Sequence, residues 1–520
     1  MLIWVKVFVN THLGGSKMSV KGYVRNFKPL EILTEGQIEQ IHAATLNVLS
    51  KTGIRFDSER ALKLFEKNRC KVDWENNRVR FPASLVEESI KMCPSQFHVK
   101  ARNPKNDMIW GGNRTYFQAL SGMDIVDIDT WKTRRPTRKE YYDGIKLLDF
   151  LENVSIIPWY TPYFGFKNVP SVMAMPEGLA ARLRMSSKFT AAGHTKGCEV
   201  FNIQLAQAAG TELRTMMAAS PPLTFYEETV EAAYRIVEAG FILLPTSGCV
   251  YGGTAPATLA GSLVTSNAEI IAGIVFAQLV RPGTRIIVQD YSFPQNMRNG
   301  SPAFGAIEIS MHQAAFNQIW HWYGVPTDGA VAYPSSKKID YQSGYEKAII
   351  ASLGAVSGTN TIWIQGAMYG ELAFHPYQAI IDDDIAGMLG RFLEGINVND
   401  ETLAVDVIDE VGPIPGHFLN KAHTRKWWKQ EHYVPRVADR LTYAEWVKSG
   451  QKDILQLAEE KYNDIIDNHK IELPLTPSQE EDIERILKEA RDYYKKKGLI
   501  TDKEWQDYQK DLSSKNYPYE

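Results

Sequence analysis

The fold is decided by eight short apolar segments: YFQAL (116–120), VSII (154–157), FTAAG (189–193), LTFY (223–226), ILLPTSG (242–248), RIIVQ (285–289), AVAY (330–333) and TIWIQ (361–365). A segment with helical periodicity follows each of them, up to about residue 395. Such alternation is typical of parallel strands joined by crossover helices. We therefore predict an α/β fold, a closed (β/α)8 TIM barrel, whose chemistry lies on the loops that follow the strands.

Outside this stretch, the chain is predicted to add two modules to the barrel, which itself spans residues 113–435. Residues 18–112 are expected to form an N-terminal α+β module. It opens with the helix TEGQIEQIHAATLNVLSKTG (34–53), which has a capping threonine and a terminating glycine. Residues 436–520 are expected to form a C-terminal helical extension. Its last helix, 478–498, is rich in Glu, Lys and Arg, and its charges are predicted to be a solvated face.

Composition excludes several classes of protein. The net charge of -3 gives no sign of a nucleic-acid or membrane partner. The four cysteines are widely spaced, which indicates neither a disulfide framework nor a structural zinc site and favours a reduced, cytoplasmic protein. The apolar start, MLIWVKVFV (1–9), is too short to span a membrane and has no basic region before it. Residues 1–17 are predicted to be an extension without function.

Aromatic residues gather just beyond the predicted strands, after five of the eight. Aromatic faces attract cations by about 0.5–2 kcal/mol each, and cages of them recognise quaternary ammonium groups. The alternative is that each ring plugs the barrel mouth or anchors a helix, but their concentration at the strand ends favours a pocket. The predicted cage residues are Tyr116, Trp159, Tyr160, Tyr251, Tyr291, Tyr333 and Phe374.

Four longer motifs resemble a known family. They are GTAPATLAGSLVTSNAEIIAGIVFAQLVRPGT (253–284), IDYQSGYEKAIIASLGAVSGTN (339–360), ETLAVDVIDEVGPIPGHFLNKAHT (401–424) and DRLTYAEW (439–446). In this order they resemble the trimethylamine methyltransferase superfamily of corrinoid-dependent methyltransferases, from about residue 33 to residue 467. The resemblance implies a barrel enzyme that moves a methyl group from an amine to the cobalt of a corrinoid (cobalamin) on a separate partner protein. No cofactor is then expected to be bound tightly by this chain.

One departure from the family pattern bears on the substrate. The trimethylamine-specific members carry pyrrolysine near the end of strand seven, whereas this chain has the ordinary residues AYPSSK (332–337) there. The members without pyrrolysine look like quaternary-amine demethylases that act on glycine betaine, proline betaine or carnitine. We therefore expect a quaternary amine as the substrate and glycine betaine as the best candidate.

The expected chemistry needs no acid or base residue, because a quaternary ammonium leaves as a neutral tertiary amine. Catalysis would be positioning of one methyl toward the cobalt. A betaine also has a carboxylate, which calls for hydrogen-bond donors. The candidates are His194, Gln289, Gln365 and His375, with His375 favoured; each is about as often a structural hydrogen-bonding residue as a ligand.

Other functions remain open. A barrel that binds such amines without turnover, as a sensor or scaffold, would have the same residues. A metal-dependent hydrolase is disfavoured because no HExxH motif and no HxH after the first strand are present. The run DDD (382–384) looks like a metal site, but a helix-dipole interaction or a partner contact is favoured there. His423 and His432 are expected either to contact the partner or to fix the C-terminal segment, and a homo-oligomer is possible.

Overall fold

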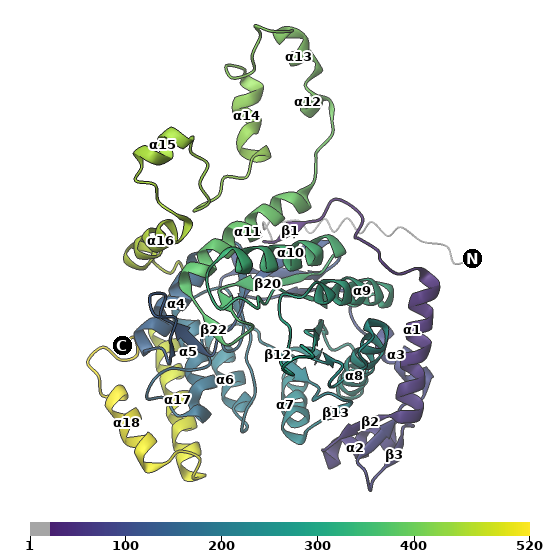
Figure 1. The fold of residues 1–520 in the computed structure, drawn as a ribbon. Coiled ribbons are helices and arrows are strands. Elements are labelled where there is room, and N and C mark those ends of the chain that lie inside the picture. The colour runs from purple at the N-terminus through teal and green to yellow at the C-terminus, as the bar shows by residue number, and fades with distance from the viewer. Residues whose placement is uncertain (1–20) are drawn as a thin grey trace.

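The computed structural model describes residues 21–520, and Figure 1 shows its ribbon. The predicted extension, residues 1–17, lies outside the described residues. Two sets of parallel strands occupy the centre, in the orders β11-β10-β7-β20-β19 and β12-β14-β16-β18. Their bounds are β7 (Arg114–Ala119), β10 (Val154–Ile157), β11 (Phe189–Thr190), β12 (Arg214–Ala218), β14 (Ile242–Ser247), β16 (Val288–Asp290), β18 (Thr327–Asp328), β19 (Ala330–Val331) and β20 (Thr361–Gln365).

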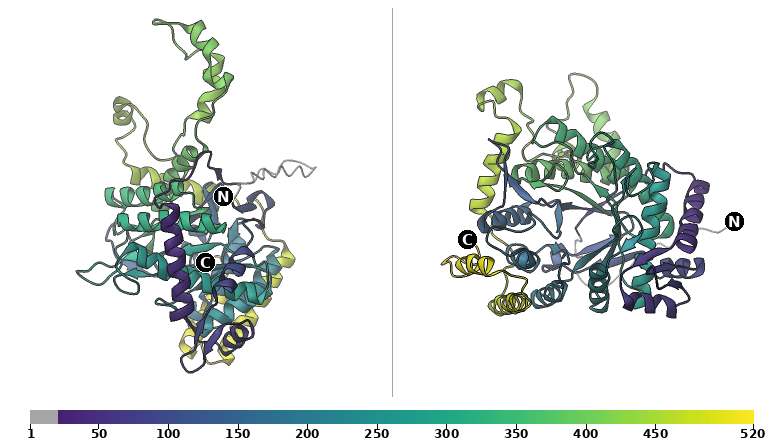
Figure 2. Two further views of the ribbon diagram at one scale, coloured as in Figure 1. Left: turned by 90° about the vertical axis from the view of Figure 1, so that its right-hand side faces the viewer. Right: turned by 60° about the horizontal axis from the view of Figure 1, so that its bottom comes forward.

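Helices connect these strands and surround them, as the right-hand view of Figure 2 shows. Parallel strands joined by helices place all their carboxyl ends at one edge. The predicted α/β class with parallel strands is therefore confirmed. The connecting helices are α4 (Arg138–Phe150), α5 (Ala174–Met185), α6 (Glu199–Ala209), α7 (Glu227–Glu238), α8 (Leu259–Val280), α9 (Ile307–Tyr323), α10 (Tyr341–Ser357) and α11 (Pro376–Glu394).

The prediction that residues 223–226 form the fourth central strand is wrong. Its residues Thr224–Phe225 form β13, which pairs with β2 (Ile54–Phe56) of the N-terminal module. The fourth central strand is β12, which pairs along its length with β14. Its sequence RTMMA opens with an arginine, whereas LTFY has the β-branched and aromatic residues typical of strands. Burial of Arg214 becomes possible because Asp328 pairs with it at 2.6 Å.

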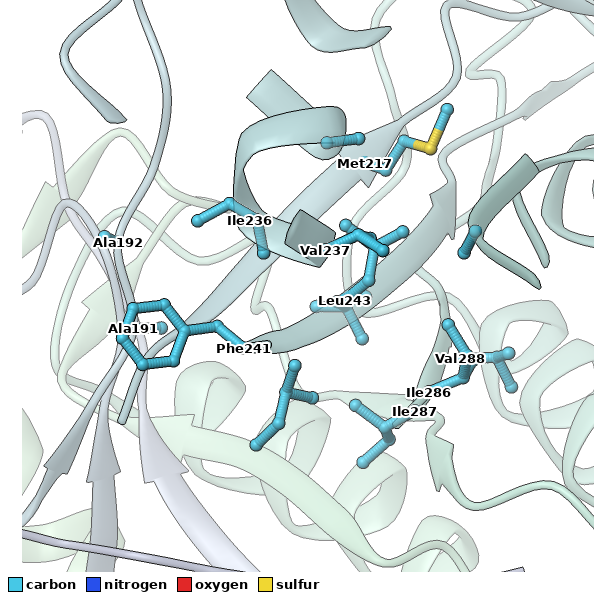
Figure 3. Close-up of a cluster of buried hydrophobic side chains, with 14 of the residues drawn as sticks. Ala191, Ala192, Met217, Ile236, Val237, Phe241, Leu243, Ile286, Ile287 and Val288 are labelled. Carbon is cyan, nitrogen blue, oxygen red and sulfur yellow. The ribbon is translucent and has the colours of Figure 1, made fainter. Parts of the chain in front are cut away.

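The core lies on both faces of the strands. Figure 3 shows Leu243 of β14 beside Val237 of α7, and both are fully buried. The neighbouring residues Ile286 and Ile287 are both fully buried as well. Since successive strand residues point to opposite faces, each face must be covered, and this explains why the strands read as continuous apolar runs.

Helix α8 is the most apolar of the connecting helices. Within residues 21–520 it is the one helix long and apolar enough to cross a membrane by length and composition, and most of it is buried inside the protein. Its apolar character is therefore explained by packing against the strands and the N-terminal module.

The N-terminal module contains the predicted helix. The helix after Thr34 has the expected threonine cap, which is completed by Gln37 as a capping box, and Gly53 ends the helix after one wider turn. An antiparallel sheet, β2-β4-β3, packs beside it. The bounds are α1 (Glu35–Asn47), α2 (Glu59–Lys67), β3 (Lys71–Asp73), β4 (Arg78–Arg80), α3 (Ala83–Lys91), β5 (Gln96–Val99) and β6 (Met108–Gly111).

The C-terminal extension is helical, with α15 (Tyr443–Lys448), α16 (Ile454–Asn468), α17 (Pro477–Lys496) and α18 (Asp502–Leu512). The prediction that the charges of α17 form only a solvated face is wrong. Arg491 lies 3.6 Å from the buried Glu177, and the buried Arg184 pairs with Glu484 at 2.6 Å. These ion pairs join α17 to α5, so the last helices are part of the packed structure.

One segment projects beyond the rest of the structure and touches α11 at its end, where Glu431 pairs with Arg391 at 2.6 Å. The chain from 400 to 431 forms α12 (Asp400–Leu403), α13 (Val405–Val411) and α14 (Ala422–Glu431), and the first two figures show it projecting beyond α10 and α11. We call residues 400–431 the arm.

Candidate functional site

A small cavity lies at the carboxyl ends of the parallel strands. Its volume is about 150 Å³, small beside the roughly 300–1,000 Å³ of pockets for drug-sized ligands. It therefore suits a compact head group. The lining residues are Ser121, Trp159, Tyr160, Met216, Gln289, Tyr291, Val331, Tyr333, Trp363 and Glu371.

Aromatic rings make up much of the wall. Trp159 and Trp363 meet edge to face, with ring centroids 5.6 Å apart, and Tyr333 lies 6.0 Å from Phe293. Tyr160 packs on Phe164 at 4.3 Å. Packing of each ring on a second aromatic fixes its orientation. The ring faces are therefore held in place before a ligand enters.

The backbone of Tyr160 is strained. Its φ is 60°, in the left-handed region that a bulky residue seldom adopts. Such a conformation costs about 1–3 kcal/mol and persists where surrounding structure imposes it, commonly at functional sites. The strain turns the Tyr160 side chain toward the cavity directly after β10.

A buried charge network lies beneath the cavity. Arg214 donates to Asp328 at 2.6 Å and to the Gln118 side-chain oxygen at 3.0 Å. The indole N–H of Trp363 also donates to Asp328. Burial raises the pKa of Asp328 to about 6, although Arg214 and the Trp363 hydrogen bond oppose the shift. The network ties a ring of the cavity wall to the centre of the strands.

Glu371 supplies the cavity with its single carboxyl group. The residue as a whole is exposed, but its carboxyl oxygen lies 3.5 Å from the Tyr333 hydroxyl, which donates to it. Desolvation of the carboxyl raises the pKa of Glu371. Among the lining residues, all of them in the described part of the chain, none is lysine or arginine. A bound ammonium would therefore meet a negative partner.

Gln289 contributes a side-chain amide to the lining of the cavity. Its side-chain oxygen is buried and has no hydrogen-bond partner within residues 21–520. A buried amide without a partner is costly, so it is a candidate for contact with a bound molecule.

The structure brings together five of the residues proposed from sequence. Trp159, Tyr160, Gln289, Tyr291 and Tyr333 all line this cavity. They lie in or just after three different strands, β10, β16 and β19, and they meet because those strands are parallel.

Three of the predicted cage aromatics do not line this cavity, so their predicted place is corrected. Tyr116 is at the start of β7, at the opposite end of the strands, and its hydroxyl bonds to the backbone of Ile109. Tyr251 donates to the backbone oxygen of Ser292 at 2.8 Å. Phe374 packs edge to face against Tyr163 in the core. Each ring has a structural partner that turns it away from the cavity.

The other polar residues proposed from the sequence do not line the cavity either, because each bonds to a partner elsewhere. His194 lies 3.0 Å from the Thr229 hydroxyl, and Gln365 donates to Asp383 at 3.4 Å. His375, the favoured residue, is the N-cap of α11, where its Nδ1 accepts from the Tyr377 N–H. Burial lowers the pKa of His375 to about 4, which keeps the ring neutral as a cap acceptor must be.

The aspartate run 382–384 lies in the middle of α11, so the helix-dipole prediction is wrong. Asp382 pairs with Lys347 at 2.6 Å, and Asp384 accepts backbone N–H groups, including that of Val437 at 2.9 Å. These aspartates hold neighbouring segments against the helix. Within residues 21–520 no group of three or more His, Cys, Asp or Glu side chains could hold a metal ion.

Sequence reasoning missed five lining residues: Ser121, Met216, Val331, Trp363 and Glu371. Trp363 and Val331 lie within strands, where alternation along the strand decides which side a residue faces. Glu371 lies in a turn after β20, and nothing in the sequence around it resembles a known motif. The aromatic residues near Tyr369 in the sequence were the feature that could have indicated that this loop lies at the cavity.

Comparison with known proteins identifies the family. The family model described as trimethylamine methyltransferase (MTTB) matches residues 10–497. The chain belongs to this family. The resemblance stated from the sequence is thereby confirmed, and so is the predicted class of enzyme, a methyltransferase.

The family's members include named relatives. A glycine betaine methyltransferase of Desulfitobacterium hafniense strain Y51 is 31% identical over 84% of this chain and 92% of its own length. A trimethylamine methyltransferase, MttB, of D. hafniense strain DSM 10664 / DCB-2 is 29% identical over 89% and 94%. A solved monomethylamine methyltransferase of Methanosarcina barkeri, MtmB, covers 88% of this chain and 92% of its own at 12% identity and a TM-score of 0.44, too low for an argument about fold.

Proposed function

We propose that this methyltransferase takes a methyl group from a quaternary ammonium compound and transfers it to the Co(I) of a corrinoid on a separate protein. The single observation that supports this best is the cavity in which Trp159, Tyr160, Tyr291 and Tyr333 converge. A quaternary ammonium cannot donate hydrogen bonds, so ring faces and a carboxylate are the groups that recognise it.

The proposed reaction balances without an acid or base. The carbon–nitrogen bond breaks with its electron pair going to nitrogen, and the neutral tertiary amine leaves. The electron pair of Co(I) forms the new cobalt–carbon bond, which gives methyl-Co(III). The enzyme's part is to hold one methyl toward the open side of the cavity, which is catalysis by positioning.

We also infer that the two sets of strands close into one eight-stranded barrel. Ala192, just after β11, bridges Thr215 of β12 in parallel. At the other junction, β18 pairs with β16 and β19 pairs with β20, while Gly329 alone separates β18 from β19. A barrel would account for the cavity's place, since barrel enzymes bind ligands at this end.

Glycine betaine is the first candidate substrate. The relative named as a glycine betaine methyltransferase, 31% identical along most of both chains, supports it. Its carboxylate would need Gln289 and the tyrosine hydroxyls as donors. Glu371 favours a second candidate, an ammonium with no carboxylate such as choline or tetramethylammonium, because like charges repel in a partly desolvated site.

The variant Glu371→Gln separates these substrates by the sign of its effect. We expect KM for choline or tetramethylammonium to rise about tenfold, and KM for glycine betaine to fall. Unit charges ~4 Å apart at an effective dielectric of ~20 interact by about 4 kcal/mol, and the exposure of Glu371 reduces this. The measurement is KM and kcat for each amine in the wild type and the variant. Equal effects on both substrates would contradict a charge role for Glu371.

The same residue predicts a pH dependence. Because desolvation raises the pKa of Glu371, its carboxyl becomes neutral at a higher pH than an ordinary glutamate. As pH falls through that pKa, KM for a cationic amine should rise and KM for glycine betaine should fall. The trend should be absent in Glu371→Gln, which serves as the control for other titrating groups.

Methyl transfer itself is tested with a reduced corrinoid. The purified chain, mixed with Co(I) corrinoid and a quaternary amine, is expected to produce the spectral change to methyl-Co(III). It should do so with glycine betaine or a simple quaternary ammonium and not with trimethylamine. A sensor or scaffold would bind the amine and leave the cobalt unmethylated, and that result would remove the proposal. The chain alone should be colourless, since the corrinoid belongs to the partner.

A further inference from the structure

Gly248 lies directly behind one ring of the cavity wall. It follows the last residue of β14, and Tyr291 follows the last residue of β16, the strand that pairs with β14. A Cβ atom placed on Gly248 would lie 2.4 Å from Cε2, 2.5 Å from Cζ and 2.9 Å from the hydroxyl oxygen of Tyr291. Carbon atoms in contact are ordinarily about 3.5–4 Å apart. The tyrosine ring therefore occupies the space that any side chain at position 248 would need.

The backbone of Gly248 gives no other reason for glycine. Its φ is not positive, so the backbone conformation does not by itself require a residue without a side chain. The contact with the Tyr291 ring is therefore the feature of this position that excludes a larger residue.

Hydrogen bonds fix the backbone on both sides of this contact. The Tyr291 N–H donates to the Ser247 carbonyl oxygen at 3.1 Å. The Cys249 N–H donates to the Ser292 hydroxyl at 2.9 Å. Because these bonds join the two strand ends before and after Gly248, neither backbone can retreat without leaving a polar group unpaired. A side chain at position 248 would instead displace the Tyr291 ring, and the open space beside that ring is the cavity that it lines.

We propose that Gly248 is a positioning residue that fixes the width of the cavity and thereby the size of the head group that the cavity accepts. The inference rests on the proposed function, in which the cavity holds a quaternary ammonium. Such a nitrogen carries four carbon substituents and presents no narrow side. In a cavity of about 150 Å³, a shift of the ring by about 1 Å takes room that this head group needs.

Binding of tetramethylammonium, measured by isothermal titration calorimetry, tests the proposal. We expect Gly248→Ala to raise Kd about tenfold, as one overpacked methyl group would. Gly36→Ala is the matched control and should keep the wild-type Kd, because a Cβ atom there would meet no atom of the described residues within 4 Å. An unchanged Kd in Gly248→Ala would overturn the proposal.

A double-mutant cycle separates positioning of the ring from a general structural role. Tyr291→Leu removes the three atoms that a Cβ atom on Gly248 would meet. Although Tyr291→Leu itself should bind more weakly, adding Gly248→Ala to it should change Kd by less than about twofold. An equal loss of affinity in both backgrounds would show that alanine disturbs the fold and not the ring, and would refute the assigned role.

These measurements do not depend on turnover. If the wild type binds tetramethylammonium but transfers no methyl group to Co(I) corrinoid from any quaternary amine, the proposed function fails and the cycle still tests Gly248. A wild type that does not bind tetramethylammonium would instead overturn the role assigned to Gly248.

Discussion

A variant in which Tyr160 and Tyr291 are both replaced by leucine is expected to lose about a thousandfold of its kcat/KM for a quaternary amine. Each ring face contributes about 2 kcal/mol to a desolvated cation, and about 1.4 kcal/mol corresponds to a tenfold change in rate. Both tyrosines line the cavity and are only half-buried, so the change should alter the site more than the core. The measurement is kcat/KM for methyl transfer to Co(I) corrinoid, with thermal unfolding to check the fold.

The matched variant Tyr160→Phe/Tyr291→Phe keeps the ring faces and removes the hydroxyls. It should retain kcat/KM within about tenfold for an ammonium without a carboxylate, because its cation–π contacts remain. A larger loss confined to glycine betaine would assign the hydroxyls to the carboxylate. Tyr226→Leu, at an exposed tyrosine away from the cavity, should have no effect. If the leucine variant keeps its activity, the rings do not recognise the cation.

The strand pattern predicted most of the central sheets because those strands are buried on both faces. Continuous apolar runs, such as the one that contains Ile286 and Ile287, indicate strands of this kind directly from the sequence. The pattern failed at β12, where the buried Arg214 is acceptable only because Asp328, more than a hundred residues later in the chain, neutralises it. A long-range ion pair of this kind leaves no trace in the local sequence.

The candidate site was predicted in part for a similar reason. Trp159 and Tyr291 follow strands directly, so the strand predictions also placed their side chains. His194 and His375 also follow strands, but local partners, the Thr229 hydroxyl and the Tyr377 N–H, decide where their rings point. Glu371 was missed because a turn after β20 brings it back over the strand ends. Side-chain direction is set by such contacts, which position in the sequence does not reveal.

The buried pair of Arg214 and Asp328 should dominate the stability of the centre. We expect Arg214→Met to lower the free energy of unfolding by about 3–5 kcal/mol, because it leaves a carboxylate buried without a partner. Arg214→Met/Asp328→Asn should recover most of this loss. Asparagine removes the charge and still offers an oxygen to the Trp363 indole N–H, which donates to Asp328 in the native chain.

The pH dependence of that loss identifies its cause. Burial already raises the pKa of Asp328 to about 6 with Arg214 present, and removal of the guanidinium should raise it further. When the pKa of a carboxyl is higher in the folded than in the unfolded state, the free energy of unfolding falls as pH rises from the unfolded-state pKa to the folded-state pKa. The loss in free energy of unfolding caused by Arg214→Met should therefore be much smaller at pH 5, where Asp328 is neutral, than at pH 8. In Arg214→Met/Asp328→Asn the loss should not depend on pH. Urea unfolding at both pH values measures it, and equal losses at the two would mean that lost packing around Arg214, not the unpaired charge, causes the destabilisation.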